Sequence, residues 1–336
     1  MLTNFTNMAQ RRKNIALLAG GYSGESVISI KSAAVIEKNL DPAKYKVFKI
    51  VITRKLWYYQ SLDGIRTPID KNDFSITINH RKVRFDCAFI AIHGTPGEDG
   101  LLQGYFEMLG IPYTTCDSIT SALTFNKGFC NKVVAAGLYA HVAKSVHLFG
   151  NNSDTAYIRE NLKFPCFVKP NAGGSSIGMS KVNNPEDLDI ALAKAFHEDH
   201  QVLVEEFISG REITCGMIKV NGKHIVFPLT EIISQKEFFD YEAKYQGKSM
   251  EITPADLTSE MAEEIRQTAT RLYDALNCKG IVRFDFIVEQ STKHIYFLEV
   301  NTVPGQSENS IVPQQARAMG LTIMELYTML IEETLR

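Results

Sequence analysis

The side chains best suited to chemistry lie near the C-terminus, on two segments that have the pattern of neighbouring strands. Arg283 and Asp285 lie on the first segment, and Glu299 and Asn301 lie on the second. Because residues i and i+2 of a strand face the same side, each pair shares one face. Carboxylate and amide oxygens are ligands that suit Mg²⁺, which proteins hold with few carboxylates together with phosphates. The pattern therefore predicts a magnesium site on this face.

The alternative for these segments is the plain polar–apolar alternation of a half-exposed sheet. The opposite face carries Phe284, Phe286, Leu298 and Val300, which predicts that it packs into a core. An ordinary exposed face would vary in residue type, whereas here the oxygen ligands are concentrated. This concentration favours the metal site.

A second constellation is a lysine at the end of a strand followed by a loop rich in glycine and serine. Lys169 ends the expected strand 164–169, and the sequence NAGGSSIG follows at 171–178. Such a loop exposes backbone N–H groups that can cradle phosphate oxygens, and the lysine would add a point charge. The alternative is a flexible hairpin with a surface lysine, and the loop alone does not decide between them.

Four further segments have the composition of site loops. Gly20 to Gly24 is followed by Glu25, whose plain interpretation is a helix cap. The acidic turn 93–100 and the Pro-Gly turn 301–307 have equally plain interpretations as turns. The aromatic and charged segment 238–245 is typical of a lid over a site.

The elements that must position these residues fall into two regions of different character. Strand–loop–helix alternation over 14–109 predicts a parallel sheet, whose carboxyl edge carries binding loops; its expected strands are 14–19, 45–52 and 84–92, and its helices 25–39 and 99–109. After about residue 125 short strands dominate, at 142–148, 164–169, 179–183, 201–206, 211–220, 223–230, 281–288 and 294–300. Helices are expected at 185–198, at 258–277 and at the C-terminus.

The common nucleotide fingerprints are absent from the sequence. There is no G-x-G, which a Rossmann site requires. A P-loop would need glycine at position 242, where the chain has Glu242, and the kinase H-R-D and D-F-G signatures are missing. If the protein uses ATP, it binds ATP by another route.

Composition excludes several classes of function. The 336 residues are enough for about two domains of the usual ~150 residues. The net charge of −2 gives no reason to expect nucleic acid as a partner, and no apolar run approaches the ~18 residues of a membrane span. The six cysteines form no CxxC and no HExxH occurs, so we expect buried, reduced cysteines in a cytoplasmic protein and no zinc site.

Taken together, these motifs resemble the ATP-grasp superfamily and, more closely, the D-alanine–D-alanine ligase family. The resemblance runs from about Asn14 to the C-terminus and rests on seven motifs in order: GG-x-S-x-E at 20–25, HG-x-x-GEDG-x-x-QG at 93–104, VKP with GSS-x-GMSKV at 168–182, EEF-x-x-G-x-E at 205–212, DYEAKY at 240–245, R-x-D at 283–285 and E-x-N-T-x-PG at 299–305. Each motif alone is weak, but their shared order makes coincidence very improbable.

The resemblance implies an α/β protein with an ATP-grasp fold, preceded by a Rossmann-like parallel α/β domain. We expect an N-terminal domain over 1–125, a central subdomain with the phosphate loop over 126–204, and a C-terminal subdomain with lid and metal site over 205–336. The implied activity is ATP-dependent ligation of two D-alanines through an acyl phosphate. The implied cofactors are ATP and two Mg²⁺ or Mn²⁺ ions. The protein is expected to form a homodimer and to have no nucleic-acid or membrane partner.

The resemblance also assigns residue roles. ATP would be bound by Lys127, Lys169, Ser176, Glu205, Glu206, Phe207, Ile208, Glu212 and Lys244, and the metal ions by Asp285, Glu299 and Asn301. Glu25, Ser175 and Tyr245 would form a triad across the lid, with Glu25 and His93 beside the first D-alanine. Arg283 and the Gly305 backbone would stabilise the oxyanion, and Ser310 and Ile311 would contact the second D-alanine.

One departure and three rival functions accompany this assignment. Where many relatives have a charged pair and then Val-Ser, this chain has Ser26-Val27-Ile28-Ser29, so we expect a repacked helix start. The rivals are a ligase that joins D-alanine to D-lactate or D-serine, another ATP-grasp carboxylate–amine ligase, and a non-catalytic nucleotide-binding module. Tyr245 favours D-alanine as acceptor, and the intact metal ligands disfavour the non-catalytic module.

Overall fold

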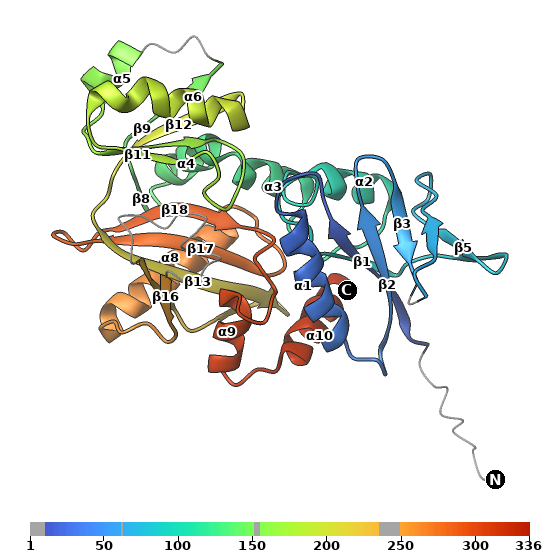
Figure 1. Cartoon of the computed structure of the whole chain (residues 1–336). Helices are drawn as coiled ribbons and strands as arrows, with labels where there is room; N and C mark the ends of the chain where they lie inside the picture. The colour runs from blue at the N-terminus through green and yellow to red at the C-terminus, as the bar shows by residue number, and fades with distance from the viewer. Residues whose placement is uncertain (1–10, 62, 151–154, 235–248) are drawn as a thin grey trace.

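The computed structural model describes residues 11–61, 63–150, 155–234 and 249–336. Its strands form three main sheets and one two-stranded sheet. In Figure 1 the N-terminal sheet lies at one end of the molecule, and the two other main sheets, from the middle and the later part of the chain, lie at the other end.

The N-terminal sheet has the order β4-β3-β2-β1-β7, with β1 parallel to both of its neighbours. Its strands are β1 (Lys13–Gly20), β2 (Tyr45–Ile52), β3 (Trp57–Gln60), β4 (Arg66–Pro68) and β7 (Cys87–Ile90), and β5 (Ile76–Ile78) pairs with β6 (Arg81–Val83) beside it. Ile15 to Ala19 are fully buried, as expected of a central parallel strand covered on both faces. The antiparallel extension by β3 and β4 was not predicted.

Helices follow the strands of this region, and two of them were missed by the sequence analysis. α1 (Ser26–Asn39) and α2 (Leu101–Leu109) were predicted, whereas α3 (Ser118–Phe125) and α4 (Lys127–Ala136) occupy a stretch where no helix was expected. Asn126 separates α3 from α4, and its side chain accepts a hydrogen bond from the Phe129 N–H as the cap of α4.

The second sheet is antiparallel throughout, in the order β11-β10-β12-β9. Its strands are β9 (Ser145–Phe149), β10 (Cys166–Pro170), β11 (Ser180–Val182) and β12 (Gln201–Glu206), accompanied by α5 (Thr155–Asn161), the 3-10 turn η1 (Pro185–Asp187) and α6 (Leu188–Glu198). Leu188, Ala191, Leu192 and Ala195 form the buried face of α6 and pack on Val168 and Val204 of the sheet.

The third sheet follows the order β16-β15-β13-β17-β18-β8, with β14 paired to β13. Its strands are β8 (His141–Val142), β13 (Gly210–Val220), β14 (Lys223–Val226), β15 (Thr230–Ser234), β16 (Ser249–Ile252), β17 (Val282–Glu289) and β18 (Ile295–Asn301). The predicted strand 142–148 is wrong, because its ends belong to separate strands in different sheets. The amphipathic helix α8 (Ser259–Ala275) covers one face and buries Ile265, Ala269 and Leu272 against Phe284 and Phe286.

The end of the chain returns to the N-terminal sheet. After α9 (Ile311–Ala318), α10 (Ile323–Thr334) starts at a capping box in which Thr322 and Glu325 satisfy each other's backbone N–H groups. Its buried face, including Leu326, Tyr327 and Ile331, shares one core with β1, α1 and β7. In Figure 1 α10 accordingly lies beside α1.

The predicted domain boundaries at residues 125 and 204 stay a prediction. The N-terminal sheet takes its strands from 13–90, and the second sheet from 145–206. The predicted boundary after residue 204 falls inside β12, and β8, from the predicted central part, pairs with β18.

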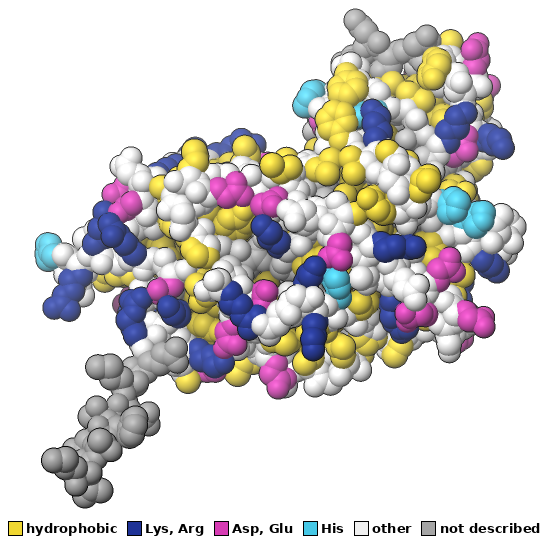
Figure 2. Space-filling view, turned by 180° about the vertical axis from the view of Figure 1, so that it is seen from behind, with side chains coloured by type: hydrophobic (Ala, Val, Ile, Leu, Met, Phe, Trp, Pro, Cys, Tyr) yellow, Lys and Arg dark blue, Asp and Glu magenta, His cyan; other side chains and the backbone are white. Residues whose placement is uncertain are grey.

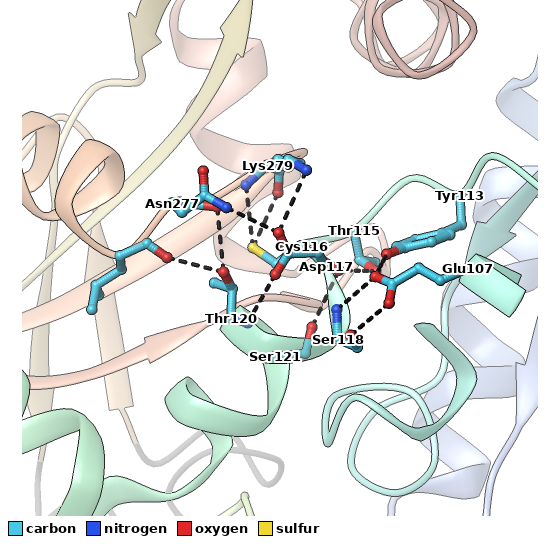
Figure 3. A network of polar contacts seen from close by, with 11 residues as sticks. Glu107, Tyr113, Thr115, Cys116, Asp117, Ser118, Thr120, Ser121, Asn277 and Lys279 are labelled. Carbon is cyan, nitrogen blue, oxygen red and sulfur yellow. Dashed lines mark hydrogen bonds and ion pairs between the residues drawn. The ribbon is translucent and has the colours of Figure 1, made fainter. Parts of the chain in front are cut away.

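A polar junction connects the start of α3 to the chain that follows α8 (Figure 3). Asp117 caps α3 by accepting from the Thr120 N–H at 2.9 Å and also accepts from Asn277 Nδ2 at 2.9 Å. Cys116 Sγ contacts the backbone N–H and carbonyl of Lys279, each at 3.3 Å. The junction therefore couples the N-terminal region to the third sheet through one capping carboxylate.

We predict that Asp117→Ala lowers the free energy of unfolding by about 2 kcal/mol, since it removes a helix cap and a charged hydrogen bond together. Asp117→Asn keeps an acceptor for the Thr120 N–H and should lose less than half as much. Urea denaturation of both variants and the wild type checks this. Equal losses in the two variants would contradict the importance of the cap.

Candidate active site

A cleft of about 540 Å³ lies where the three main sheets and their loops meet. Its walls come from the start of α1, the loop after β7, the first turn of α4, the Gly-rich loop, β17, β18 and the segment that leads into α9. Ten residues predicted from the sequence line it: Glu25, His93, Lys127, Ser175, Arg283, Glu299, Asn301, Gly305, Ser310 and Ile311.

The polar face predicted for β17 and β18 is present, and the pairing of the strands explains it. Arg283 lies opposite Asn301, and Asp285 lies opposite Glu299. Asn301 Nδ2 is 3.0 Å from Asp285 Oδ2 and 3.4 Å from Glu299 Oε1. The side chains predicted as metal ligands are therefore brought together.

The apolar side of these strands differs from the prediction at one position. A β-bulge after Asp285 shifts the register, so that Phe297 pairs with Phe286 and is buried with it in the core. Leu298, expected on that face, is only partly buried. The extra residue of the bulge changes which side chains of β18 point into the core at this position.

Arg283 and Asp285 form a buried bidentate ion pair. Arg283 Nε donates to Asp285 Oδ1 at 2.8 Å, and its NH2 group donates to Oδ2 at 2.7 Å. Burial by itself would lower the pKa of Arg283, but the carboxylates of Asp285, Glu299 and Glu212 hold it above its ordinary value. Arg283 is therefore a permanent cation at the wall of the cleft.

The donor set on this face fits divalent cations. Asp285 Oδ2 accepts from Arg283 and from Asn301, whereas Oδ1 accepts from Arg283 alone and keeps a lone pair that can ligate an ion. Among the described residues, no group of three or more His, Cys, Asp or Glu side chains forms a metal site. The predicted set is instead two carboxylates and one amide, which suits Mg²⁺ bound with phosphate oxygens.

Lys127 connects this face with the Gly-rich loop. It is the first residue of α4, and its ammonium lies 3.4 Å from Glu299 Oε2 and donates to the Gly173 carbonyl at 2.6 Å. Its own N–H donates to the Asn171 carbonyl at 3.2 Å. A cation is thus held between the loop that can cradle phosphate and a predicted metal ligand.

Glu25 does not cap α1, although that was its plain interpretation. It precedes the helix without a side-chain capping bond, and instead Ser175 Oγ donates to Glu25 Oε1 at 2.6 Å. A Cβ on Gly174 would lie 2.8 Å from the same carboxylate oxygen, so a side chain there would displace the contact. The Gly-rich loop therefore reaches the N-terminal region at Glu25.

The remaining predicted substrate residues lie along one wall. His93 is buried, and Gly305 has no room for a side chain, because a Cβ there would lie 2.8 Å from Ser310 Oγ. Ser310 immediately precedes α9, and Ile311 is its first residue. These four residues line the same cleft.

A second group of predicted residues does not line the cleft, and most of them lie in or beside the second sheet. Lys169 Nζ donates to Glu205 Oε1 at 2.5 Å, and both side chains are largely buried. The Phe207 ring packs edge-on to Phe167. Ser176 follows Ser175 in the Gly-rich loop, Glu206 accepts from the Lys163 N–H at 3.0 Å, Ile208 follows Phe207, and Glu212 lies on β13.

Two predicted residues, Lys244 and Tyr245, lie outside the described residues, as does the whole of the predicted lid segment 238–245. The predicted triad is therefore described only for Glu25 and Ser175.

The sequence analysis missed several residues of the cleft, of which Glu98 is the most informative. Glu98 lines the cleft and accepts from the Gly94 N–H at 2.6 Å. Burial, reinforced by the negative charge of Glu25, raises the pKa of Glu98 from 4.5 to about 8, although N–H groups of Gly94 and Val303 and the charge of Lys127 oppose the rise. Its place in the acidic turn was noticed, but nothing local distinguishes a buried carboxyl from a cap.

Comparison with known proteins gives a clear family. The family description "D-ala D-ala ligase N-terminus" matches residues 14–116, and "D-ala D-ala ligase C-terminus" matches residues 134–332. The chain belongs to the D-alanine–D-alanine ligase family. A relative from Phocaeicola vulgatus named D-alanine--D-alanine ligase is 46% identical over 322 residues, which cover 96% of this chain and 99% of that protein.

Other relatives agree with this assignment. A D-alanine--D-alanine ligase from Parabacteroides distasonis is 47% identical, covering 97% of this chain and 98% of the relative. Among solved structures, the D-Ala:D-Ser ligase VanG from Enterococcus faecalis has a TM-score of 0.87 at 33% identity, covering 96% of this chain and 100% of its own. The Bacillus anthracis ligase complexed with ATP has a TM-score of 0.77 at 30% identity, covering 97% and 98%.

These comparisons confirm the predicted family, the ATP-grasp fold class and the assignment as a ligase. The roles of individual residues stay predictions. All six cysteines are free and buried, as predicted.

We predict that Glu98 makes the unliganded protein less stable as the pH rises. Between the unfolded pKa of 4.5 and the folded pKa of about 8, the folded state binds a proton that the unfolded state has released, so the free energy of unfolding falls across this window. Glu98→Gln should flatten that dependence, and the exposed control Glu186→Gln should not. Urea denaturation at several pH values from about 5 to about 8 measures the slope, and an unchanged slope in Glu98→Gln would contradict the assignment.

Proposed function

We propose that this protein joins two D-alanines to D-alanyl-D-alanine at the expense of ATP, through an acyl-phosphate intermediate. The observation that carries the proposal is the single cleft that contains Glu25, Lys127, Arg283 and Gly305. A carboxylate, two cations and a backbone turn line the same cavity, which supports roles for them toward a substrate ammonium, phosphate and an oxyanion. The product would serve peptidoglycan precursor synthesis and so cell shape.

The chemistry requires activation of a carboxylate, which is a poor electrophile. Transfer of the γ-phosphoryl group of ATP to the first D-alanine gives an acyl phosphate with a good leaving group. Lys127 and the Gly-rich loop would hold the phosphates, with Lys169, Ser176 and Lys244 contributing and with Glu205, Glu206, Phe207, Ile208 and Glu212 around the nucleoside. Glu25, supported by Ser175 and Tyr245, would hold the first substrate's ammonium beside His93.

The amine of the second D-alanine then attacks the acyl phosphate, and the tetrahedral oxyanion collapses with loss of phosphate. Arg283 stabilises this oxyanion together with the Gly305 backbone, since a guanidinium held by Asp285 is fixed in position and remains charged. Ser310 and Ile311, at the start of α9, would contact the second substrate.

Asp285, Glu299 and Asn301 would hold two Mg²⁺ or Mn²⁺ ions. When bound, such ions offset the charge that develops on the transferred phosphoryl group. Glu299 is held next to Lys127 before any ion binds, so the cation site and the phosphate site are already adjacent.

The acceptor is the finer part of the proposal. The D-Ala:D-Ser ligase VanG shares the fold closely, but curated relatives at 46% and 47% identity are named as D-alanine--D-alanine ligases. Tyr245 is also present in the sequence, which supports D-alanine over D-lactate and D-serine.

We further propose a cytoplasmic homodimer without nucleic-acid or membrane partners. Basic and acidic side chains are interspersed over the face drawn in Figure 2. Within the described parts of the chain, none of the helices has the length and apolar character for crossing a bilayer. Helices α2 to α4 expose large apolar side chains that a second copy would cover, namely Leu101, Met108, Ile119, Phe129 and Val133.

We predict that ADP release depends on D-alanine and exceeds the release with D-serine or D-lactate as second substrate. A coupled assay of ADP formation, with each acceptor mixed with limiting D-alanine at neutral pH, measures this. Higher turnover with D-lactate or D-serine would identify the chain as a ligase that joins D-alanine to that acceptor. ATP binding without ADP formation, in the presence of D-alanine and Mg²⁺, would favour the non-catalytic module.

We predict that Glu299→Ala lowers kcat at least about a hundredfold and weakens activation by Mg²⁺, because it removes a metal ligand that faces Lys127. Titration of Mg²⁺ and Mn²⁺ in the same assay measures the concentration for half-maximal activity. The surface variant Glu186→Gln is the control and should match the wild type. Unchanged metal dependence in Glu299→Ala would remove Glu299 from the proposed site.

A further inference from the structure

The turn that carries Gly305 is held at both ends by side chains from the N-terminal region. At its far end, the Gln306 N–H donates to Ser32 Oγ at 3.3 Å. Ser32 Oγ lies 3.1 Å from His93 Nε2, and His93 Nδ1 lies 2.9 Å from the Val303 carbonyl. A chain of three hydrogen bonds therefore runs from residue 306 back to residue 303 and closes the turn from outside.

The proton positions in this chain follow from its two ends. The Val303 carbonyl can only accept, so His93 carries its proton on Nδ1, and in the neutral ring Nε2 is then an acceptor. Ser32 must donate its hydroxyl proton to Nε2 while its oxygen accepts from the Gln306 N–H. Each hydrogen bond then has one donor and one acceptor, and His93 and Ser32 each donate one bond and accept another.

Further contacts surround the same turn. Glu98 accepts from the Gly94 N–H at 2.6 Å, and the Val303 N–H lies near enough to its carboxyl to favour the charged form, so the segment 93–98 faces both backbone polar groups of Val303. Inside the turn, Gln306 Nε2 donates to the Pro304 carbonyl at 3.1 Å, and its Oε1 accepts from the Tyr327 hydroxyl at 3.1 Å.

Three members of the network are buried. Ser32 is fully buried, and His93 and Gln306 are 6% and 5% exposed. In such surroundings the loss of a hydrogen-bond partner is costly, so the network favours one geometry of the turn over alternatives.

We propose that Ser32 and Glu98 are positioning residues of the ligation reaction: acting through His93 and Val303, they fix the turn 303–306 and thereby the Gly305 backbone where the tetrahedral oxyanion forms. The inference rests on the proposed role of Gly305. It extends that role by assigning the orientation of the oxyanion site to the N-terminal region, whereas Gly305 and Arg283 belong to the C-terminal part.

The chain offers a matched pair of serines for the test. Ser29 and Ser32 both lie on α1 and are both fully buried. Ser29 donates to the Ala91 carbonyl at 2.7 Å and accepts from the Gly20 N–H at 3.0 Å, both within the N-terminal sheet region. Ser29→Ala and Ser32→Ala therefore remove the same hydroxyl from the same helix, but only Ser32→Ala releases the turn.

We expect Ser32→Ala to lower kcat by roughly ten- to hundredfold, the range for a displaced oxyanion donor, while the Kd for ATP changes less than about twofold. Its affinity for a dipeptide phosphinate, whose tetrahedral phosphorus mimics the intermediate, should fall by a similar factor. Ser29→Ala should retain the wild-type kcat and phosphinate affinity, even where its melting temperature falls as much.

Glu98→Ala provides a second, independent variant, since it removes the carboxyl that accepts from the Gly94 N–H beside Val303. We expect a drop in kcat and phosphinate affinity of the same kind. Equal kcat in Ser29→Ala and Ser32→Ala, or a loss in Ser32→Ala that appears only as weaker ATP binding, would overturn the inference.

Hydrogen exchange separates this inference from the proposed function. The amides of 303, 305 and 306 should exchange faster in Ser32→Ala than in Ser29→Ala in the absence of substrates. Absence of D-alanine-dependent ADP release in the wild type would contradict the proposed function but leave this measurement valid. Equal exchange rates in the two variants would contradict the inference even if the wild type is an active ligase.

Discussion

The register of β17 on β18 is the constraint on which the site depends. Asp285 and Glu299 face each other only in this register, with Arg283 and Asn301 as the next pair. A slip by one residue would turn these charges into the core and bring Phe284 and Phe286 to the cleft. Burial of those two rings against α8 therefore fixes the position of the charged face, and the core of the third sheet and the chemistry of the cleft are specified together.

The charges of the site are balanced before any ligand binds. Arg283 is paired with Asp285, Lys169 with Glu205, and Lys127 approaches Glu299. An unpaired charge of this kind would carry a large desolvation cost, whereas a pair held by hydrogen bonds keeps each group in one orientation. The pairs also fix the positions of the cations Lys169 and Arg283.

The sequence was informative where the pattern is local or the motif is long. Alternation on β17 and β18, the buried run of β1 and the amphipathic period of α8 each predicted an element and its buried face. The α3–α4 pair was missed because both helices are short and their main signals are the caps Asp117 and Asn126. The strands β3 and β4 lie in a segment where polar and apolar residues alternate only weakly. They form an antiparallel edge of the sheet, which the strand–loop–helix pattern does not predict.

For the site, Glu25 and Ser175 are 150 residues apart in the chain, and only the family motifs linked them. Ser32 carried no such signal, and Glu98 was assigned no role although it lies in the motif at 93–104. Their importance lies in what they contact, since Ser32 reaches a turn 274 residues further along. A serine on a helix and a glutamate in a turn have the same local sequence pattern whether they face solvent or contact a distant part of the chain.

The return of α10 to the N-terminal sheet bears on how the protein is made. Leu326, Tyr327 and Ile331 complete the core that β1 and α1 begin, and Phe89 packs edge-on to Tyr327 with the ring centres 5.4 Å apart. During synthesis β1 and α1 leave the ribosome before α10, so the apolar surface that α10 covers stays exposed until α10 emerges. The core of this region can therefore close only after residues 323–331 have been made.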